Sequence, residues 1–231
     1  MNSLIFPSLG FCRSRVPQTR HAAKSPSRPA LPQETDLSVF SLSRVIAIFD
    51  EDNLRISMGK EHHARLSYRL LYDKLVATSA SLHAVAVLTD EPGRQQRACY
   101  LKNRGWVPLV IEREVVTTCH GAEVKSNADT DLAVEAGRLL SLHPCDVLCL
   151  GSGDGDLVLA IAKAVRRCWP QTKVVTVAVP GCTSARLRKH SELIHQHVPI
   201  GADITRSGGS RPRHRRIRPT HTNPQLHACH V

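Results

Sequence analysis

Short apolar runs alternate with longer amphipathic segments through the middle of the chain. The runs have the length of buried strands, and the segments between them carry apolar residues at helical spacing. We predict strands at Arg44–Phe49, Ala84–Leu88, Trp106–Glu112, Val147–Leu150 and Lys173–Val179. Because strands that alternate with helices favour a parallel sheet covered on both faces, the pattern predicts a three-layer α/β domain with a mostly parallel five-stranded sheet.

Helices are predicted between these strands. They run from Leu54 to about Thr78, over Gln95–Arg104, over Asp129–Leu142, from Leu157 to about Arg167, and from a cap at Thr183 or Ser184 to about His195. Gly105 is expected to end the second helix, because glycine is common just past a helix C-terminus. Pro108 places its strand at an edge of the sheet, since proline lacks the N–H that a central strand needs.

A glycine loop, Gly151-Ser152-Gly153-Asp154-Gly155-Asp156, breaks the pattern after Val147–Leu150. Its two carboxylates lie between the end of a strand and the start of a helix, where open α/β sheets bind ligands. The glycines let the backbone turn sharply and leave the acids uncovered. One acid is enough to cap the helix, and a dinucleotide-binding G-x-G-x-x-G motif would need glycine where Asp156 stands. We therefore interpret the loop as a cation site.

Carboxylates also follow the first predicted strand, which ends at Asp50-Glu51-Asp52-Asn53. Right-handed crossovers bring the carboxyl ends of parallel strands to one edge of the sheet, so Asp50, Asp154 and Asp156 are expected to converge. Asp129 joins them if the helix that it opens begins near that edge. Several carboxylates without histidine or thiolate partners suit Mg²⁺ or Mn²⁺, and such a site can activate water for attack on a phosphodiester.

Composition limits the classes of protein that need considering. With 231 residues the chain has room for one α/β domain with tails, and no apolar run is long enough for a membrane helix, so no membrane partner is expected. The formal net charge of +11 lies mostly in the two ends of the chain. The eight cysteines form no C-x-x-C pair, which argues against zinc and for a reducing, intracellular compartment.

We divide the chain into residues 1–42 as a disordered or targeting leader, 43–203 as the folded domain, and 204–231 as a basic disordered tail. The leader is rich in arginine and serine and poor in acids, as transit peptides are, but its prolines interrupt any amphipathic helix. We expect a cytoplasmic protein, or an organellar one if residues 1–42 are a transit peptide. Homo-oligomer formation stays open.

The order of these motifs resembles the NYN domain, in the LabA-like branch of the PIN-like nuclease superfamily. The likeness covers about residues 44–200. It is carried by Asp50-x-x-Asn53, by Lys125 followed by Asp129-x-x-Leu132-x-x-Glu135, by Ser152-Gly153-Asp154-Gly155-Asp156, and by Ser184-x-x-Leu187 with Ser191–Ile194. Glu135 replaces the usual aspartate and Lys125 lies one residue further from the acid than is common, so the roles of these two residues are open.

The resemblance implies a PIN-like, metal-dependent ribonuclease that uses Mg²⁺ or Mn²⁺ and acts on RNA. Its metal ligands and catalytic acids would be Asp50, Asp129, Asp154 and Asp156. Asn53 would fix Asp50 or contact the phosphate, and Ser152 and Lys125 would bind substrate. Helix capping explains Asn53 and Asp129 equally well, and Lys125 has a second interpretation as a surface lysine.

Two other functions fit parts of the sequence. A phosphatase of the haloacid dehalogenase type would use Asp50-x-Asp52 after the first strand with Thr89 after the second, but it needs threonine or valine where Leu54 stands. A non-catalytic RNA-binding module is favoured by the run RPRHRRIR at 211–218, although such a run without aromatic residues offers phosphate contacts and no base stacking.

Overall fold

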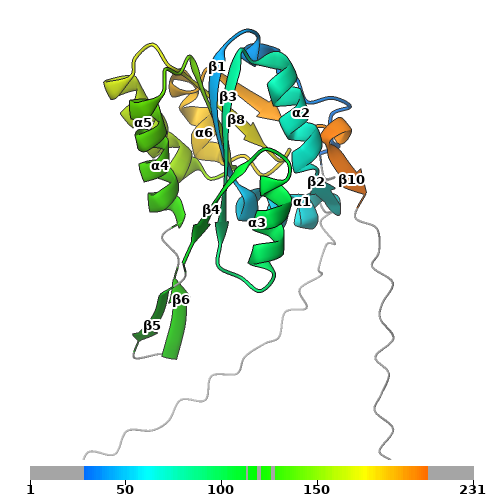
Figure 1. The fold of residues 1–231 in the computed structure, drawn as a ribbon, viewed down its shortest axis with the longest axis vertical. Helices are drawn as coiled ribbons and strands as arrows, with labels where there is room; N and C mark the ends of the chain where they lie inside the picture. The colour runs from blue at the N-terminus through cyan, green and yellow to red at the C-terminus, as the bar shows by residue number, and fades with distance from the viewer. Residues whose placement is uncertain (1–28, 113, 119–120, 126–127, 208–231) are drawn as a thin grey trace, which may run out of the picture.

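A parallel sheet of six strands forms the centre of the protein (Figure 1). The computed structural model describes residues 29–112, 114–118, 121–125 and 128–207. The strand order is β4 (Val107–Ile111), β3 (Ser81–Thr89), β1 (Arg44–Asp50), β7 (Val147–Gly151), β8 (Lys173–Ala178) and β9 (Gln196–Pro199). The five predicted strands are all present, and Pro108 does lie in an edge strand. The sequence analysis missed β9 because Val198 is its one buried residue.

Helices cover both faces of this sheet. One face carries α1 (Glu51–His62), α2 (Tyr68–Thr78) and α3 (Arg94–Lys102), and the other carries α4 (Ala128–Leu142), α5 (Gly155–Cys168) and α6 (Ala185–Lys189). Side chains of β1 alternate between the two cores: Val45, Ala47 and Phe49 pack toward α1–α3, and Ile46 and Ile48 pack toward α4 and α5. The three-layer α/β prediction is therefore confirmed.

The single helix predicted from Leu54 to Thr78 is wrong, because the chain turns between α1 and α2. His63 takes a left-handed backbone conformation with φ 51° and ends α1. The next residues form β2 (Ala64–Leu66), which pairs antiparallel with β10 (Thr205–Ser207). The Ser67 side chain then caps α2. The break was missed because the sequence here has neither the glycine nor the proline that commonly marks such a turn.

Two further differences follow β4 and β8. A hairpin of β5 (Glu114–Thr118) and β6 (Gly121–Lys125) extends away from the sheet, where no element was predicted (Figure 1). The helix expected to reach His195 ends at Lys189 and is followed by a 3₁₀ turn at Ser191–Leu193.

Residues 29–43 pack against the domain although the sequence analysis placed most of them in the leader. Leu37 and Phe40 are buried, and Ser38–Phe40 form a short 3₁₀ helix a few residues before β1. The Thr35 hydroxyl accepts a hydrogen bond from Gly201 N at 2.7 Å, and Thr35 N donates to the Asp203 carboxylate at 2.9 Å. The rest of the predicted leader, 1–28, and the tail from 208 onward lie outside the described residues. No helix in the described ranges has both the length and the apolar character that a membrane crossing requires.

Trp106 anchors the core under α2. Its side chain is 1% exposed, and its Nε1–H donates to the Tyr68 carbonyl at 2.9 Å. The rings of Phe49, Tyr68 and Tyr72 meet it edge-on, with centroids 5.1, 5.5 and 6.0 Å away. This one indole therefore joins β1 to α2 at the start of β4.

Trp106→Phe should lower the free energy of unfolding by about 2–4 kcal/mol, because ring volume is lost and the buried Tyr68 carbonyl loses its donor. Urea unfolding followed by circular dichroism measures this. The matched control is Trp169→Phe, since Trp169 is the second of the two tryptophans and is only partly buried. The control should cost about 1 kcal/mol or less. Equal losses in both variants would contradict the anchoring role.

Candidate active site

The chain reverses its direction of winding between β1 and β7. Successive strands run outward from β1 through β3 to β4 and outward from β7 through β8 to β9. Open α/β sheets bind ligands in the crevice at such a reversal, beyond the carboxyl ends of the two strands. Here Phe49 of β1 lies in register with Gly151 of β7. The residues that follow, Asp50 and Ser152, therefore stand side by side at that crevice, as the sequence analysis expected for this edge.

Close packing, rather than backbone conformation, requires the glycines of the loop. Gly151, Gly153 and Gly155 do not have positive φ, so the chain passes from β7 into α5 without the left-handed conformation that favours glycine. A Cβ on Gly151 would meet the Phe49 ring, and one on Gly153 would lie 2.6 Å from the Cys182 carbonyl oxygen. A Cβ on Gly155 would lie 2.5 Å from the Ser184 hydroxyl. Side chains at these positions would push the loop away from β1 and α6.

Asp50 and Asp154 occupy equivalent positions, because each caps the helix that leaves its strand. Asp50 Oδ1 accepts a hydrogen bond from Asn53 N at 2.9 Å, at the start of α1. Asp154 Oδ1 accepts from Asp156 N at 2.8 Å, at the start of α5. In the described part of the chain, Oδ2 of each acid makes no hydrogen bond. Each carboxylate is thus oriented by one oxygen and has the other available.

Asn53 connects α1 to the glycine loop. Its side-chain Oδ1 accepts a hydrogen bond from Gly153 N at 3.2 Å, while its backbone N holds Asp50. The helix cap is Asp50 and not Asn53, so the capping interpretation of Asn53 is wrong. Ser152 is 2% exposed, and its hydroxyl accepts from Asp154 N at 3.2 Å. Both polar side chains therefore fix the shape of the loop.

Three acids from three elements repel one another at this edge. Burial, with the negative charges of Asp52, Asp129 and Asp154, raises the pKa of Asp50 to about 6. Burial and the charge of Asp154 also raise the pKa of Asp129, in the first turn of α4. The helix that Asp129 opens does begin near the edge. Asp50, Asp129 and Asp154, which we call the acid trio, are therefore close enough to interact electrostatically.

The other expected site residues lie differently. Asp156 is in the first turn of α5, its side chain is 70% exposed, and it forms an ion pair with Arg186 of α6. Glu135 is held by Arg138, with two hydrogen bonds of 2.7 Å. Lys125 ends β6, and its side chain lies outside those that the structure describes. The structure therefore brings together three of the four predicted metal ligands and pairs the fourth with an arginine.

The acid trio offers only oxygen atoms, which suit a hard cation such as Mg²⁺ or Mn²⁺. A cation there would also relieve the repulsion that raises the pKa of Asp50. Within residues 29–112 and 128–207, no group of three or more histidine, cysteine, aspartate or glutamate side chains is close enough to hold a metal ion as it stands. The donor chemistry fits a divalent cation, and the carboxylates would have to move closer to bind it.

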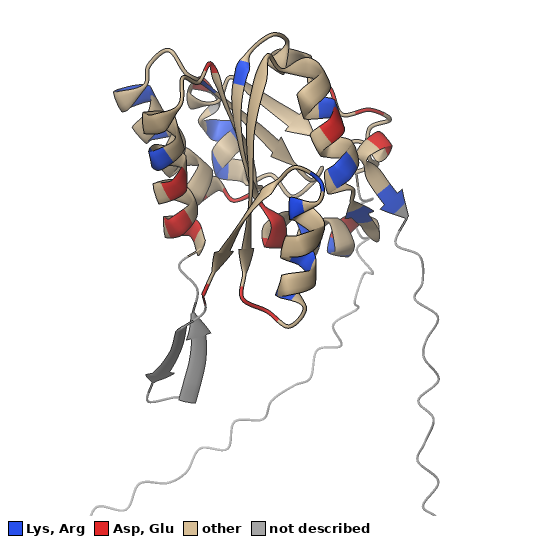
Figure 2. Cartoon of the chain, viewed as in Figure 1, with Lys and Arg blue, Asp and Glu red and all other residues tan. Residues whose placement is uncertain are grey.

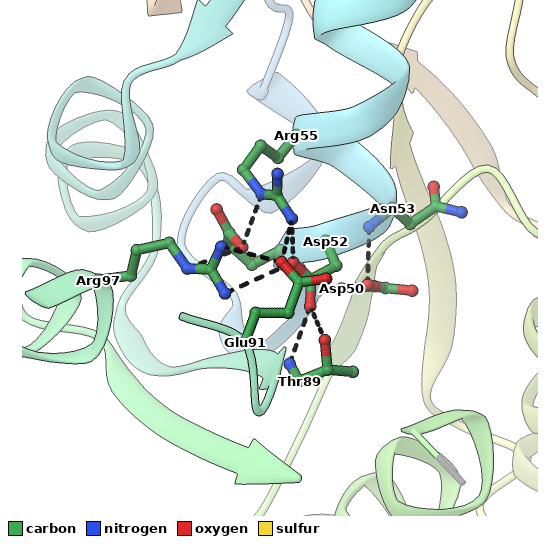
Figure 3. A network of polar contacts seen from close by, with 8 residues as sticks. Asp50, Asp52, Asn53, Arg55, Thr89, Glu91 and Arg97 are labelled. Carbon is green, nitrogen blue, oxygen red and sulfur yellow. Dashed lines mark hydrogen bonds and ion pairs between the residues drawn. The ribbon is translucent and has the colours of Figure 1, made fainter. Parts of the chain in front are cut away.

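A second polar cluster lies on the other side of the first turn of α1 (Figure 3). Asp52 accepts hydrogen bonds from Thr89 N at 2.8 Å, from the Thr89 hydroxyl at 2.6 Å and from Arg55 at 2.5 Å. Burial would raise the pKa of Asp52, but the hydrogen bonds from Arg55 and Thr89 outweigh burial and lower it. Glu91 and Arg97 complete the cluster. It ties α1 to the end of β3 and to α3.

This cluster was not predicted, because Asp52 and Thr89 were interpreted only as parts of a phosphatase motif. The local signals available were the i,i+4 spacing of Glu51 and Arg55 and the i,i+3 spacing of Asp52 and Arg55. Arg97 lies more than forty residues from Asp52 in the sequence, so only the packing of α3 against α1 joins them.

Comparisons with known proteins agree with this architecture. The crystal structure of a protein of unknown function from Vibrio parahaemolyticus matches with a TM-score of 0.59 and 18% sequence identity, covering 71% of this chain and 97% of that chain. At that identity the likeness establishes the fold alone. A comparison with curated proteins found no match. The family model of the NYN domain matches residues 44–195. Because the matched region is more than half of the chain and contains the acid trio, the protein belongs to the NYN domain family, within the PIN-like nuclease superfamily.

Proposed function

We propose that this protein is a metal-dependent ribonuclease that hydrolyses RNA phosphodiester bonds at the acid trio. The observation that carries the proposal is the convergence of Asp50, Asp129 and Asp154 at the switch point of the sheet, where burial and neighbouring negative charges raise the pKa of Asp50 and of Asp129. Like charges held together at a cost to folding are typical of functional sites. Membership of a nuclease superfamily supports a nucleic-acid substrate, and RNA is the substrate that we assign.

Asp50, Asp129 and Asp154 would hold Mg²⁺ or Mn²⁺. Once bound, the ion supplies charge neutralisation for the phosphodiester and activates a water molecule. The capping hydrogen bonds keep Asp50 and Asp154 aimed at the crevice through Oδ1 and leave Oδ2 for the ion. Asp156 is the proposed fourth ligand, and it must first leave Arg186.

The surrounding backbone prepares the site for an anionic substrate. The N-termini of α1, α4 and α5 lie at this edge, and the positive ends of their dipoles favour phosphate oxygens. Arg186 lies beside the loop on α6 and would be free to contact the RNA backbone if Asp156 served as a metal ligand. Ser152 holds the shape of the loop through Asp154 N, Asn53 ties the loop to α1, and in this proposal Lys125 contributes a further phosphate contact.

Asp154→Asn should abolish most of the Mg²⁺- or Mn²⁺-dependent cleavage of labelled RNA, by about 100-fold or more, because the site loses one of its ligand charges. Folding should survive, since asparagine caps a helix about as well as aspartate and the substitution relieves repulsion within the acid trio. Circular dichroism checks the fold.

Asp131→Asn is the matched control, because Asp131 lies in the same region of α4 and exerts none of the charges that shift Asp129. Its RNA cleavage should equal that of the wild type. The same assay with DNA and with a phosphomonoester as substrates distinguishes the proposed ribonuclease from a nuclease that acts on DNA and from a phosphatase. An active, folded Asp154→Asn variant would refute the assignment of the site.

Asp50→Asn should stabilise the metal-free protein at about pH 8 and have little effect at about pH 4. Because the pKa of Asp50 is raised to about 6, the folded state binds its proton more tightly than the unfolded chain does. Folding therefore loses stability as the pH rises through 6, and asparagine, which mimics the protonated acid, escapes that loss. We expect a gain of about 1–3 kcal/mol, measured by thermal unfolding in EDTA. A gain of equal size at both pH values would contradict the electrostatic origin.

A further inference from the structure

A cavity of about 530 Å³ lies beside α1, on the face opposite Asn53. This volume is within the usual range for small-molecule sites. Its lining residues come from α1, β2, α3 and the first residue of α2, and they include Glu51, Arg55, Gly59, Arg97, Tyr100 and Tyr68. Because Glu51 directly follows Asp50, this cavity and the crevice at Asp50 lie on the two sides of the first turn of α1.

Several buried polar atoms at this cavity have no hydrogen-bond partner in the described part of the chain. They include the Tyr68 hydroxyl, which has no partner of any kind in that part. Glu51 Oε2 and Nε and Nη2 of Arg97 also make no hydrogen bond, but they form ion pairs: Glu51 Oε2 lies 3.5 Å from Arg55 Nε and 4.0 Å from Arg97 Nε, and Arg97 Nη2 lies 3.8 Å from Asp52. Tyr68 is 5% exposed, so bulk water does not satisfy its hydroxyl. Because buried polar groups without partners are rare in folded proteins, this hydroxyl indicates a ligand that offers it a hydrogen bond.

The charge of the interior argues against a phosphate as that ligand. Arg55 already lies 2.5 Å from Asp52 and 3.3 Å from Glu91, and Arg97 lies 3.5 Å from Glu91. With Glu51, three acids face the two arginines, so the interior has no excess of positive charge. A neutral group suits such an interior better than an anion does.

The rim of the cavity, in contrast, is positive. Arg65 of β2 lines it and is exposed, and the register of the β2–β10 ribbon places Arg206 directly beside Arg65. Lys and Arg residues also lie along α3 (Figure 2). Tyr100 is 38% exposed and offers an aromatic surface at the same opening. An interior without excess positive charge, below a cationic and aromatic rim, matches a base attached to a charged backbone.

We propose that this cavity binds an unpaired nucleobase of the RNA substrate, while Arg65 and Arg206 hold the adjoining phosphates. The proposal rests on the ribonuclease function and names the substrate as single-stranded RNA. Single-stranded RNA is recognised by splaying out bases, stacking them on aromatic rings and hydrogen-bonding to their edges. In this arrangement the base edge meets the Tyr68 hydroxyl, and the strand continues past α1 to the acid trio.

Gly59 allows the cavity to be filled without disturbing the helix. A Cβ at Gly59 meets nothing within 4 Å, so a larger side chain there enters the open space. Gly137 in α4 is the matched control, because a Cβ there also meets nothing within 4 Å and α4 covers the other face of the sheet. Leucine at either position also favours the helix over glycine.

The test compares the full-length wild type with Gly59→Leu and Gly137→Leu. Fluorescence anisotropy in EDTA measures their affinity for a short labelled single-stranded RNA and for an abasic ribose-phosphate strand of the same length. Without metal no cleavage occurs, so binding is measured apart from the ribonuclease activity. We expect Gly59→Leu to bind the base-bearing RNA about 10-fold more weakly and the abasic strand as the wild type does. Gly137→Leu should match the wild type on both strands.

Each other result overturns the proposal in a recognisable way. Unchanged affinity of Gly59→Leu for both strands would show that the cavity holds no base, and equal losses on both would assign it to the backbone phosphates. Tyr68→Phe removes only the hydroxyl and gives a second variant if Gly59→Leu misfolds. It should weaken the base-bearing RNA several-fold and leave the abasic strand unaffected.

Steady-state cleavage with Mg²⁺ then tests the ribonuclease function separately. Gly59→Leu should raise KM for RNA about 10-fold and leave kcat near the wild-type value, because the cavity binds substrate and contains none of the proposed metal ligands. A wild type that binds bases in the cavity but cleaves no RNA would refute the ribonuclease and retain the cavity assignment. If the wild type cleaves RNA with the same KM as Gly59→Leu, the cavity assignment is refuted and the ribonuclease function is retained.

Discussion

The site depends on carboxylates held close together against their own repulsion. Burial raises the pKa of Asp50 to about 6, and the neighbouring negative charges of Asp52, Asp129 and Asp154 add to this rise. The backbone opposes the repulsion between the carboxylates, because each acid accepts hydrogen bonds from the first turn of the helix that follows it. Parallel pairing of β1 with β7 then sets those two helix starts side by side. The capping interaction therefore stabilises the fold and orients the proposed ligands at once.

The same first turn of α1 serves two environments. One side presents Asp50 to the crevice, and Asn53 there holds the glycine loop in place. The other side carries Glu51, Asp52 and Arg55 into a network that reaches β3 and α3 (Figure 3). A shift of this turn would alter both environments together. In our proposals, α1 is therefore the one element that positions both the reacting phosphate and the bound base.

The acid trio and Asp156 differ in a way that bears on how the site would assemble. Asp50 and Asp154 are fixed by backbone amides, whereas Asp156 is exposed and paired with Arg186. An exposed ion pair is weak, so exchanging Arg186 for a cation costs little free energy. The family match and the shared fold establish the scaffold on which this chemistry is proposed.

Local sequence determined much of this protein. The apolar runs placed five strands of the sheet, because buried parallel strands need continuous apolar residues whatever surrounds them. Acids directly after β1 and in the loop after β7 were visible as an edge cluster, because connection handedness leaves little freedom in where strand ends lie. The reason for the glycines was not visible, since it lies in contacts with Phe49, Cys182 and Ser184 from other elements.

Tertiary structure alone decided the remaining features. The turn at His63, the β2–β10 ribbon and the polar β9 depend on partners distant in the sequence, so no local pattern marks them. The same holds for the pairing of Asp156 with Arg186 and for the joining of Arg97 to the α1 cluster. The cavity beside α1 is likewise lined by elements that only the fold brings together, namely α1, β2, α2 and α3. Sequence thus determined which residues could form the site, and packing decided which of them meet, because charge and hydrogen-bond partners are set by distance in space.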